Sequence, residues 1–252
     1  GFMKKNKRIL AMLMAVLMIF GITACNNSAN SANNSYNTDN GTGSVADNGK
    51  VLADAGKDSV VIAIGSEPET LDPTKGWGHG NSPIVQSTLV KYTSELNFEN
   101  DLAVDYKLSD DGLTWTFTIR DDAYFTDGEK VTADDVAFTL ETAKASNGSF
   151  DLTYIESAVA QDETTVVITL SRPTSIFLNT LASVGIVPEH AYNDDYGMNP
   201  IGSGPYKFVE WRPQEQIMFT ANENYYGEAP DIKNVTVVFM SEDAALAAVK
   251  AG

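Results

Sequence analysis

Hydrophobic and polar residues alternate along several short stretches of the chain, which is the pattern of β-strands with one buried face. Residues 102–108 and 115–119 alternate most clearly, and Asp110, Asp111 and Gly112 between them are typical turn residues. A second pair of such stretches covers residues 206–211 and 216–221. We therefore predict two β-hairpins, each with one face turned to a core.

Shorter apolar runs and helix-start signals predict the remaining elements. Four further strands are expected at residues 59–65, 155–160, 165–170 and 235–239. Helices are expected at residues 83–92, 132–145 and 175–182 and from residue 241, with a helical turn at 188–192. Thr132 is a typical N-cap, because acidic residues follow it in the first turn. This mixture of hairpins and alternating strands and helices predicts an α/β fold with mixed sheets.

The N-terminus has the layout of a secretory signal. A basic stretch is followed by an apolar run at residues 9–22 and by small residues. This run is shorter than the ~20 residues that a membrane-spanning helix needs. The stretch Ile22-Thr23-Ala24-Cys25 resembles the bacterial lipobox, so residues 1–25 are expected to be a lipoprotein signal peptide, with Cys25 lipidated after cleavage. A plain cleavage site with a chance cysteine is the alternative.

Residues 26–58 consist mainly of Asn, Ser, Gly, Asp and Ala. Such a segment buries too little apolar surface to offset the entropy of ordering it, so we expect a disordered tether. The residues after it supply most of the 43% hydrophobic content, which suffices for one large or two small cores.

The charge of the chain argues against nucleic-acid binding. The formal net charge is -17, and without residues 1–25 the remaining 13 basic and 34 acidic residues give -21. Such a surface repels phosphate backbones. Solubility outside the cell explains this acidity, and attraction of a cationic ligand is the alternative. Cys25 is the only cysteine in the sequence, so no intrachain disulfide is possible.

Patterns typical of enzymes and cofactor sites are missing from the sequence. The two histidines lack the spacing of a zinc protease, and no phosphate-binding glycine loop occurs. Ser203 lies between two glycines, but Ile201 stands where the nucleophile-elbow pattern needs glycine. Adjacent acids such as Asp134 and Asp135 are typical of caps and solvated faces. We therefore expect no catalytic residues, no cofactor and no metal site.

A long block resembles a known family of proteins. Residues 110–138, DDGLTWTFTIRDDAYFTDGEKVTADDVAF, resemble the signature of the family 5 extracytoplasmic solute-binding proteins, the oligopeptide-, dipeptide- and nickel-binding lipoproteins of ABC transporters. Four landmarks agree in order: GSEPETLDP at 65–73, VPEH at 187–190, IGSGPYKFVEW at 201–211 and NENYYG at 222–227. The resemblance covers residue 59 to the end.

This resemblance implies a periplasmic-binding-protein-like fold of type II, in which two lobes close around a ligand. The chain is expected to hold mostly the first lobe and to be truncated before the second. One subdomain would combine residues 59–77 and 196–252, and residues of about 78–195 would form an inserted subdomain.

The resemblance also implies where a ligand would bind. In this family the loop at residues 75–81 and the loop at 147–150 face the cleft. Carried onto this sequence, the ligand-binding residues would be Trp77, His79, Asn81, Asn147 and Phe150. The alternative is that Trp77 packs inside the lobe and that His79 is a surface residue.

The ligand is expected to be a peptide or a nickel chelate. The stretch GWGHGNSP is close to that of nickel-binding relatives, but one histidine cannot hold nickel alone, so the metal would arrive chelated. The chain would then be the extracytoplasmic, lipid-anchored component of an ABC importer, a monomer that delivers its ligand to a permease and its ATPase. The alternative is a sensory or adhesive lipoprotein that retains the fold without transport.

Overall fold

The computed structural model describes residues 57–76, 83–146 and 148–251. All of these residues belong to one compact unit. In the described ranges, no helix combines the length and the apolar character that crossing a membrane requires.

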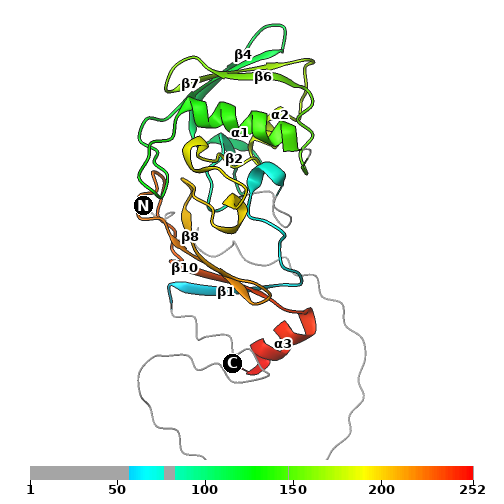
Figure 1. Ribbon diagram of the computed structural model, residues 1–252, viewed down its shortest axis with the longest axis vertical. Helices are drawn as coiled ribbons and strands as arrows, with labels where there is room; N and C mark the ends of the chain where they lie inside the picture. The colour runs from blue at the N-terminus through cyan, green and yellow to red at the C-terminus, as the bar shows by residue number, and fades with distance from the viewer. Residues whose placement is uncertain (1–56, 77–82, 147, 252) are drawn as a thin grey trace, which may run out of the picture. The chain divides into compact units, whose positions relative to one another are not determined.

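One sheet joins the beginning and the end of the described chain (Figure 1). Its strands lie in the order β1 (Ser59–Ile64), β10 (Asn234–Phe239), β9 (Gln216–Ala221) and β8 (Tyr206–Arg212). β1 runs parallel to β10, and the other pairs are antiparallel. The predicted hairpin of β8 and β9 is confirmed, and the mixed pairing agrees with the predicted class of sheet.

A second sheet of four strands is entirely antiparallel. Its order is β4 (Ala103–Leu108), β5 (Thr114–Ile119), β7 (Thr165–Leu170) and β6 (Ile155–Ala160). In β5 the aromatic and aliphatic side chains are buried, and the threonines between them are half-buried. The alternation thus marks the two faces of the sheet in β5. In β4 it does not: Val104 and Leu108, expected on the buried face, are exposed, and the register shifts between Ala103 and Asp105.

Helix α1 (Ala133–Ser146) packs against β6 and β7 of the second sheet (Figure 1). It begins where the sequence predicts: the backbone N–H and the hydroxyl of Thr132 donate to Asp135 Oδ2 at 2.9 and 3.0 Å. Val136 and Leu140, four residues apart on one face, are fully buried. The helix is thus fixed by a local cap and by one apolar face.

The remaining elements are short. They are η1 (Pro73–Lys75), β2 (Val90–Tyr92), β3 (Phe98–Asn100), α2 (Phe177–Leu181), η2 (Glu189–Ala191), η3 (Tyr196–Met198) and α3 (Glu242–Ala251).

The helix predicted at residues 83–92 is wrong. Residues 83–89 form no helix, and the last three residues form strand β2. Every residue from 85 to 90 is buried, so no polar face is left for an amphipathic helix. The carbonyl of Val85 instead accepts a hydrogen bond from the N–H of Gly204 at 2.8 Å. Contacts with distant backbone therefore replace the local bonds of a helix.

The buried apolar residues form two clusters. The larger lies between α1 and the second sheet and includes Phe117 and Phe177, and the smaller packs Leu71 and Val85 against the first sheet. Tyr226, which follows β9 in the chain, packs against the larger cluster. The bounds of the two predicted subdomains remain a prediction.

Candidate functional site

The segment between β1 and η1 is tied to the tip of the β8–β9 hairpin. The carboxylate of Glu67 accepts a hydrogen bond from Trp211 Nε1 at 2.7 Å and from the backbone N–H of Gln214 at 3.1 Å. Gln214 has a φ of 64°, in the left-handed region that only a few non-glycine residues occupy. Glu67 thus holds the first part of the segment against this turn.

Asp72 is completely buried and fixes the start of η1. Its Oδ1 accepts from the backbone N–H of Thr74 at 2.9 Å and from the Thr74 hydroxyl at 2.7 Å. Its Oδ2 accepts from the Tyr192 hydroxyl at 2.8 Å and lies 3.4 Å from Lys75 Nζ. A buried carboxylate needs several donors, and here they come from η1 itself and from a residue 120 positions away.

Two tyrosines next to Asp72 remain neutral. Burial raises the pKa of Tyr192 to about 12 and also raises the pKa of Tyr196. The ring centroids of these tyrosines are 5.2 Å apart, and the Tyr196 hydroxyl accepts a hydrogen bond from Gln86 Nε2 at 3.1 Å. At physiological pH both phenols are therefore neutral and donate to oxygen, Tyr192 to Asp72 Oδ2 and Tyr196 to the carbonyl of Ile201.

The loop after α1 meets η1 directly. The hydroxyl of Ser146 donates to the carbonyl of Thr74 at 2.7 Å, and the hydroxyl of Ser149 donates to the carbonyl of Gly76 at 3.5 Å. Gly76 ends η1 with a φ of 69°. The described parts of the two loops at residues 75–81 and 147–150 therefore lie against each other, although more than 70 residues separate them in the sequence.

Most of the predicted ligand-binding residues lie outside the described residues. These are Trp77, His79, Asn81 and Asn147, and Cys25 also lies outside. Phe150 is described: it is half-buried and packs against the larger apolar cluster. Its role in ligand binding remains a prediction.

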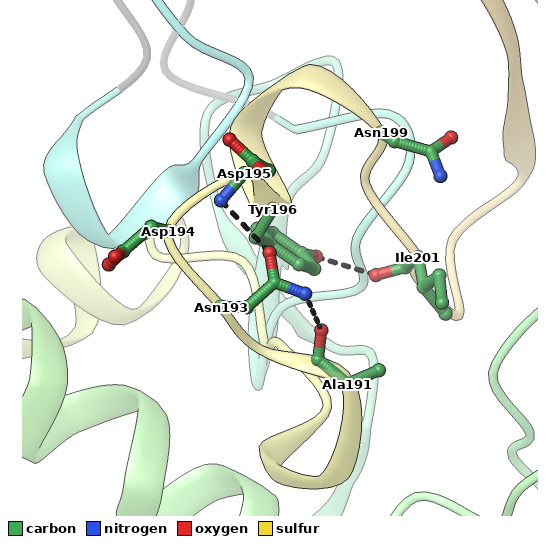
Figure 2. Close-up of a pocket in the computed structure, with 7 residues that line it drawn as sticks. All are labelled: Ala191, Asn193, Asp194, Asp195, Tyr196, Asn199 and Ile201. Carbon is green, nitrogen blue, oxygen red and sulfur yellow. Dashed lines mark hydrogen bonds between the residues drawn. The ribbon is translucent and has the colours of Figure 1, made fainter.

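Tyr196 also lines a hollow of about 570 Å³. Figure 2 shows the residues around it. Its lining residues are Ala191, Asn193, Asp194, Asp195, Tyr196, Asn199 and Ile201. Asn193 bonds to its neighbours, because its Oδ1 accepts from the N–H of Asp195 at 2.9 Å and its Nδ2 donates to the carbonyl of Ala191 at 3.3 Å. Ligand pockets are mostly apolar, whereas polar and acidic side chains contribute much of this lining, so we assign it no ligand.

Within the described ranges, no three His, Cys, Asp or Glu side chains gather as a metal site would require. His190, the described histidine, has its Nε2 2.7 Å from Asp127 Oδ2, and its ring packs edge-on against Phe125. The contact between His190 and Asp127 thus links η2 to the turn at residues 126–128.

The role of Asp72 was missed at the sequence level. The order Asp72-Pro73-Thr74 is a start signal, since aspartate is a good N-cap and proline is favoured at the first helical position. That signal could have revealed η1. Nothing local could have revealed Tyr192 as the partner, because its contact with Asp72 depends on the complete fold.

Comparison with known proteins gives a consistent picture. The profile of the Bacterial extracellular solute-binding proteins, family 5 Middle, matches residues 97–252. Protein XP55 of Streptomyces lividans is 35% identical over 241 residues, which cover 91% of this chain and 41% of that protein. The probable D,D-dipeptide-binding periplasmic protein DdpA of Escherichia coli K12 is 35% identical over 208 residues, covering 75% of this chain and 40% of that protein.

Solved structures agree with this match. The crystal structure of NikZ from Campylobacter jejuni in complex with Ni(L-His) has a TM-score of 0.73 and 32% identity, and covers 78% of this chain and 42% of that chain. The predicted α/β fold with mixed sheets, like that of type II periplasmic binding proteins, is thereby confirmed. The chain spans about two fifths of the length of these relatives.

Proposed function

Because the chain belongs to the bacterial extracellular solute-binding proteins of family 5, we propose that it is the extracytoplasmic substrate-binding component of an ABC importer. It captures peptides or nickel chelates outside the cytoplasm and delivers them to a membrane permease. In this role it binds and releases its ligand without chemical change, and it is not an enzyme.

The observation that carries this proposal is the likeness to NikZ, at 32% identity over 78% of the chain. At such identity the likeness extends beyond the fold, which many unrelated functions can share. The contact between Ser149 and Gly76 supports it further, because the resemblance implies that the loops at residues 75–81 and 147–150 face the cleft.

The names of the relatives point to two classes of ligand. NikZ was crystallised with Ni(L-His), and DdpA is named as a probable D,D-dipeptide-binding protein. A nickel chelate suits the imidazole of His79, and a peptide suits the stacking surface of Trp77. We propose that Asn81, Asn147 and Phe150 complete this side of the site.

The lipidated Cys25 anchors the protein to the outer side of the cell membrane, with residues 26–58 as the tether. Two acyl chains on one cysteine are enough for stable anchoring. The mature protein works as a monomer and contacts the permease, whose ATPase drives transport.

Uptake by cells tests the importer role. Cells with and without the gene are given a labelled tetrapeptide mixture or radioactive nickel with L-histidine, and the label inside the cells is counted. We expect loss of the gene to reduce uptake of one of the two probes, and reintroduction of the gene to restore it. Unchanged uptake of both, together with normal binding by the purified protein, would favour the sensory or adhesive alternative.

A further inference from the structure

Two glycines lie where η1 and the loop after α1 cross. A Cβ atom added at Gly148 would lie 2.7 Å from the carbonyl oxygen of Lys75, 2.8 Å from its carbonyl carbon and 2.9 Å from its Cα. A Cβ added at Gly76 would meet the side chain of Ser149 and lie 3.0 Å from its backbone nitrogen. Each segment thus has a glycine at the position where the other approaches most closely.

The crossing leaves no room for adjustment at Gly148. The atoms facing it belong to the backbone of Lys75, which cannot rotate away as a side chain can. The backbone of Lys75 is itself fixed, because its N–H bonds to the carbonyl of Asp72 at 3.2 Å and Asp72 is buried. This close approach of backbone is a reason that a side chain does not fit at Gly148.

Hydrogen bonds on both sides hold the crossing together. The Ser146 hydroxyl, which donates to the carbonyl of Thr74 at 2.7 Å, also accepts from the N–H of Gly148 at 3.1 Å. Ser149 reaches the carbonyl of Gly76 on the other side. One hydroxyl therefore connects the end of α1, the loop after it and the backbone of η1.

We propose that Gly148 and Ser146 are positioning residues that join η1 and the loop after α1 into one unit. Resting on the proposed function, the inference is that this unit sets the geometry of one side of the ligand site. Such preorganised loops bind with a smaller loss of conformational entropy than two loops that move independently. In this role Gly148 acts through the backbone of Lys75, which it approaches closely.

The coupling can be tested without any ligand. Gly148→Ala in the full-length protein is compared with Gly65→Ala, because a Cβ at Gly65 meets nothing within 4 Å and Gly65 has no positive φ. Hydrogen exchange read by mass spectrometry follows the peptide that contains Thr74, whose N–H is buried and bonded to Asp72. We expect the N–H of Thr74 to exchange faster than in the wild type in Gly148→Ala, and at the wild-type rate in Gly65→Ala. Equal exchange at Thr74 in both variants would overturn the coupling.

Binding then tests the positioning role. The probes are a tetrapeptide mixture and nickel with two equivalents of L-histidine, titrated by calorimetry. We expect a Kd roughly five- to tenfold weaker for Gly148→Ala, as for energetically coupled positions, and an unchanged Kd for Gly65→Ala. Ser146→Ala should weaken binding in the same direction, and Ser146→Thr should restore it by keeping the hydroxyl. Faster exchange with unchanged affinity would overturn the positioning role.

The two proposals fail in different ways. If even the wild-type protein binds neither probe, the proposed ligands are wrong, and exchange at Thr74 still decides whether the two loops are coupled. If the wild type binds and Gly148→Ala binds equally well, the proposed function stands and this inference is wrong.

Discussion

Replacing Asp72 by alanine should cost far more stability than replacing an aspartate with the same local contacts on the surface. Asp72 accepts from the backbone N–H and the hydroxyl of the threonine two residues later. Asp162 does the same with Thr164, at 2.9 and 3.2 Å, but it is exposed. Asp162 also bonds to Thr165. The comparison therefore removes the contribution of the contacts with the threonine two residues later, and the difference reports mainly on burial and on Tyr192.

The size of the effect follows from the partners that lose their acceptor. The Tyr192 hydroxyl bonds to Asp72 at 2.8 Å, and a hydrogen bond to a charged group contributes ~1.5–3 kcal/mol. The buried N–H and hydroxyl of Thr74 would also be left without an acceptor. Lys75 contributes little, since half of its side chain is exposed. Each buried donor left without an acceptor costs ~1–3 kcal/mol, so with three donors affected we expect a loss of ~3–5 kcal/mol for Asp72→Ala.

Urea unfolding followed by far-ultraviolet circular dichroism measures both variants in the full-length protein. The free energy of unfolding should fall by ~3–5 kcal/mol for Asp72→Ala. For Asp162→Ala it should fall by much less. Tyr192→Phe removes one donor, so its loss of unfolding free energy should lie between those of the two aspartate variants. Equal losses for Asp72→Ala and Asp162→Ala would refute the claim that burial and Tyr192 make Asp72 a structural anchor.

Three further predictions concern the anchor, the ligand and the tyrosines. Cys25→Ala should release the protein from membranes or leave its signal uncut, as fractionation and mass spectrometry would reveal, and membrane retention after cleavage would contradict the lipid anchor. Trp77→Ala should weaken binding of the peptide mixture or of nickel with histidine by ~1–3 kcal/mol in calorimetry and shift the melting temperature little, whereas lost stability with unchanged binding would assign Trp77 to the core. Because burial raises the pKa of Tyr192 from 10.0 to about 12, the folded state holds this proton more tightly, so its contribution to stability is complete below pH 10 and lost between pH 10 and 12. Urea titrations across this range should show a smaller alkaline loss for Tyr192→Phe, and an identical loss would refute this assignment.

The sequence predicts those elements whose causes are local. The hairpin of β4 and β5 follows from alternation and a turn, and α1 follows from its cap and its apolar face. The same reasoning predicted a helix at residues 83–92 wrongly, because proline near a helix start and scattered apolar residues are helix signals. Its burial depends instead on distant parts of the chain, such as Gly204, whose N–H donates to the carbonyl of Val85.

The candidate site was predictable only in part. The two loops could be proposed from the resemblance, but their contact through Ser146 and Thr74 depends on how α1 lies on η1. The sequence shows a glycine at position 148, but glycine is required there because the backbone of Lys75 passes so close, which only the fold reveals. Such contacts join residues far apart in the chain, so no local pattern encodes them.

Native mass spectrometry of the purified full-length protein tests the central claim, that this protein captures a small solute. The protein is desalted and incubated with the tetrapeptide mixture or with nickel and L-histidine, and its mass is then measured under non-denaturing conditions. We predict a complex heavier by the mass of one tetrapeptide, or by that of nickel with histidine, at micromolar ligand. A folded protein that stays at its bare mass with every probe, up to millimolar concentration, would contradict the claim.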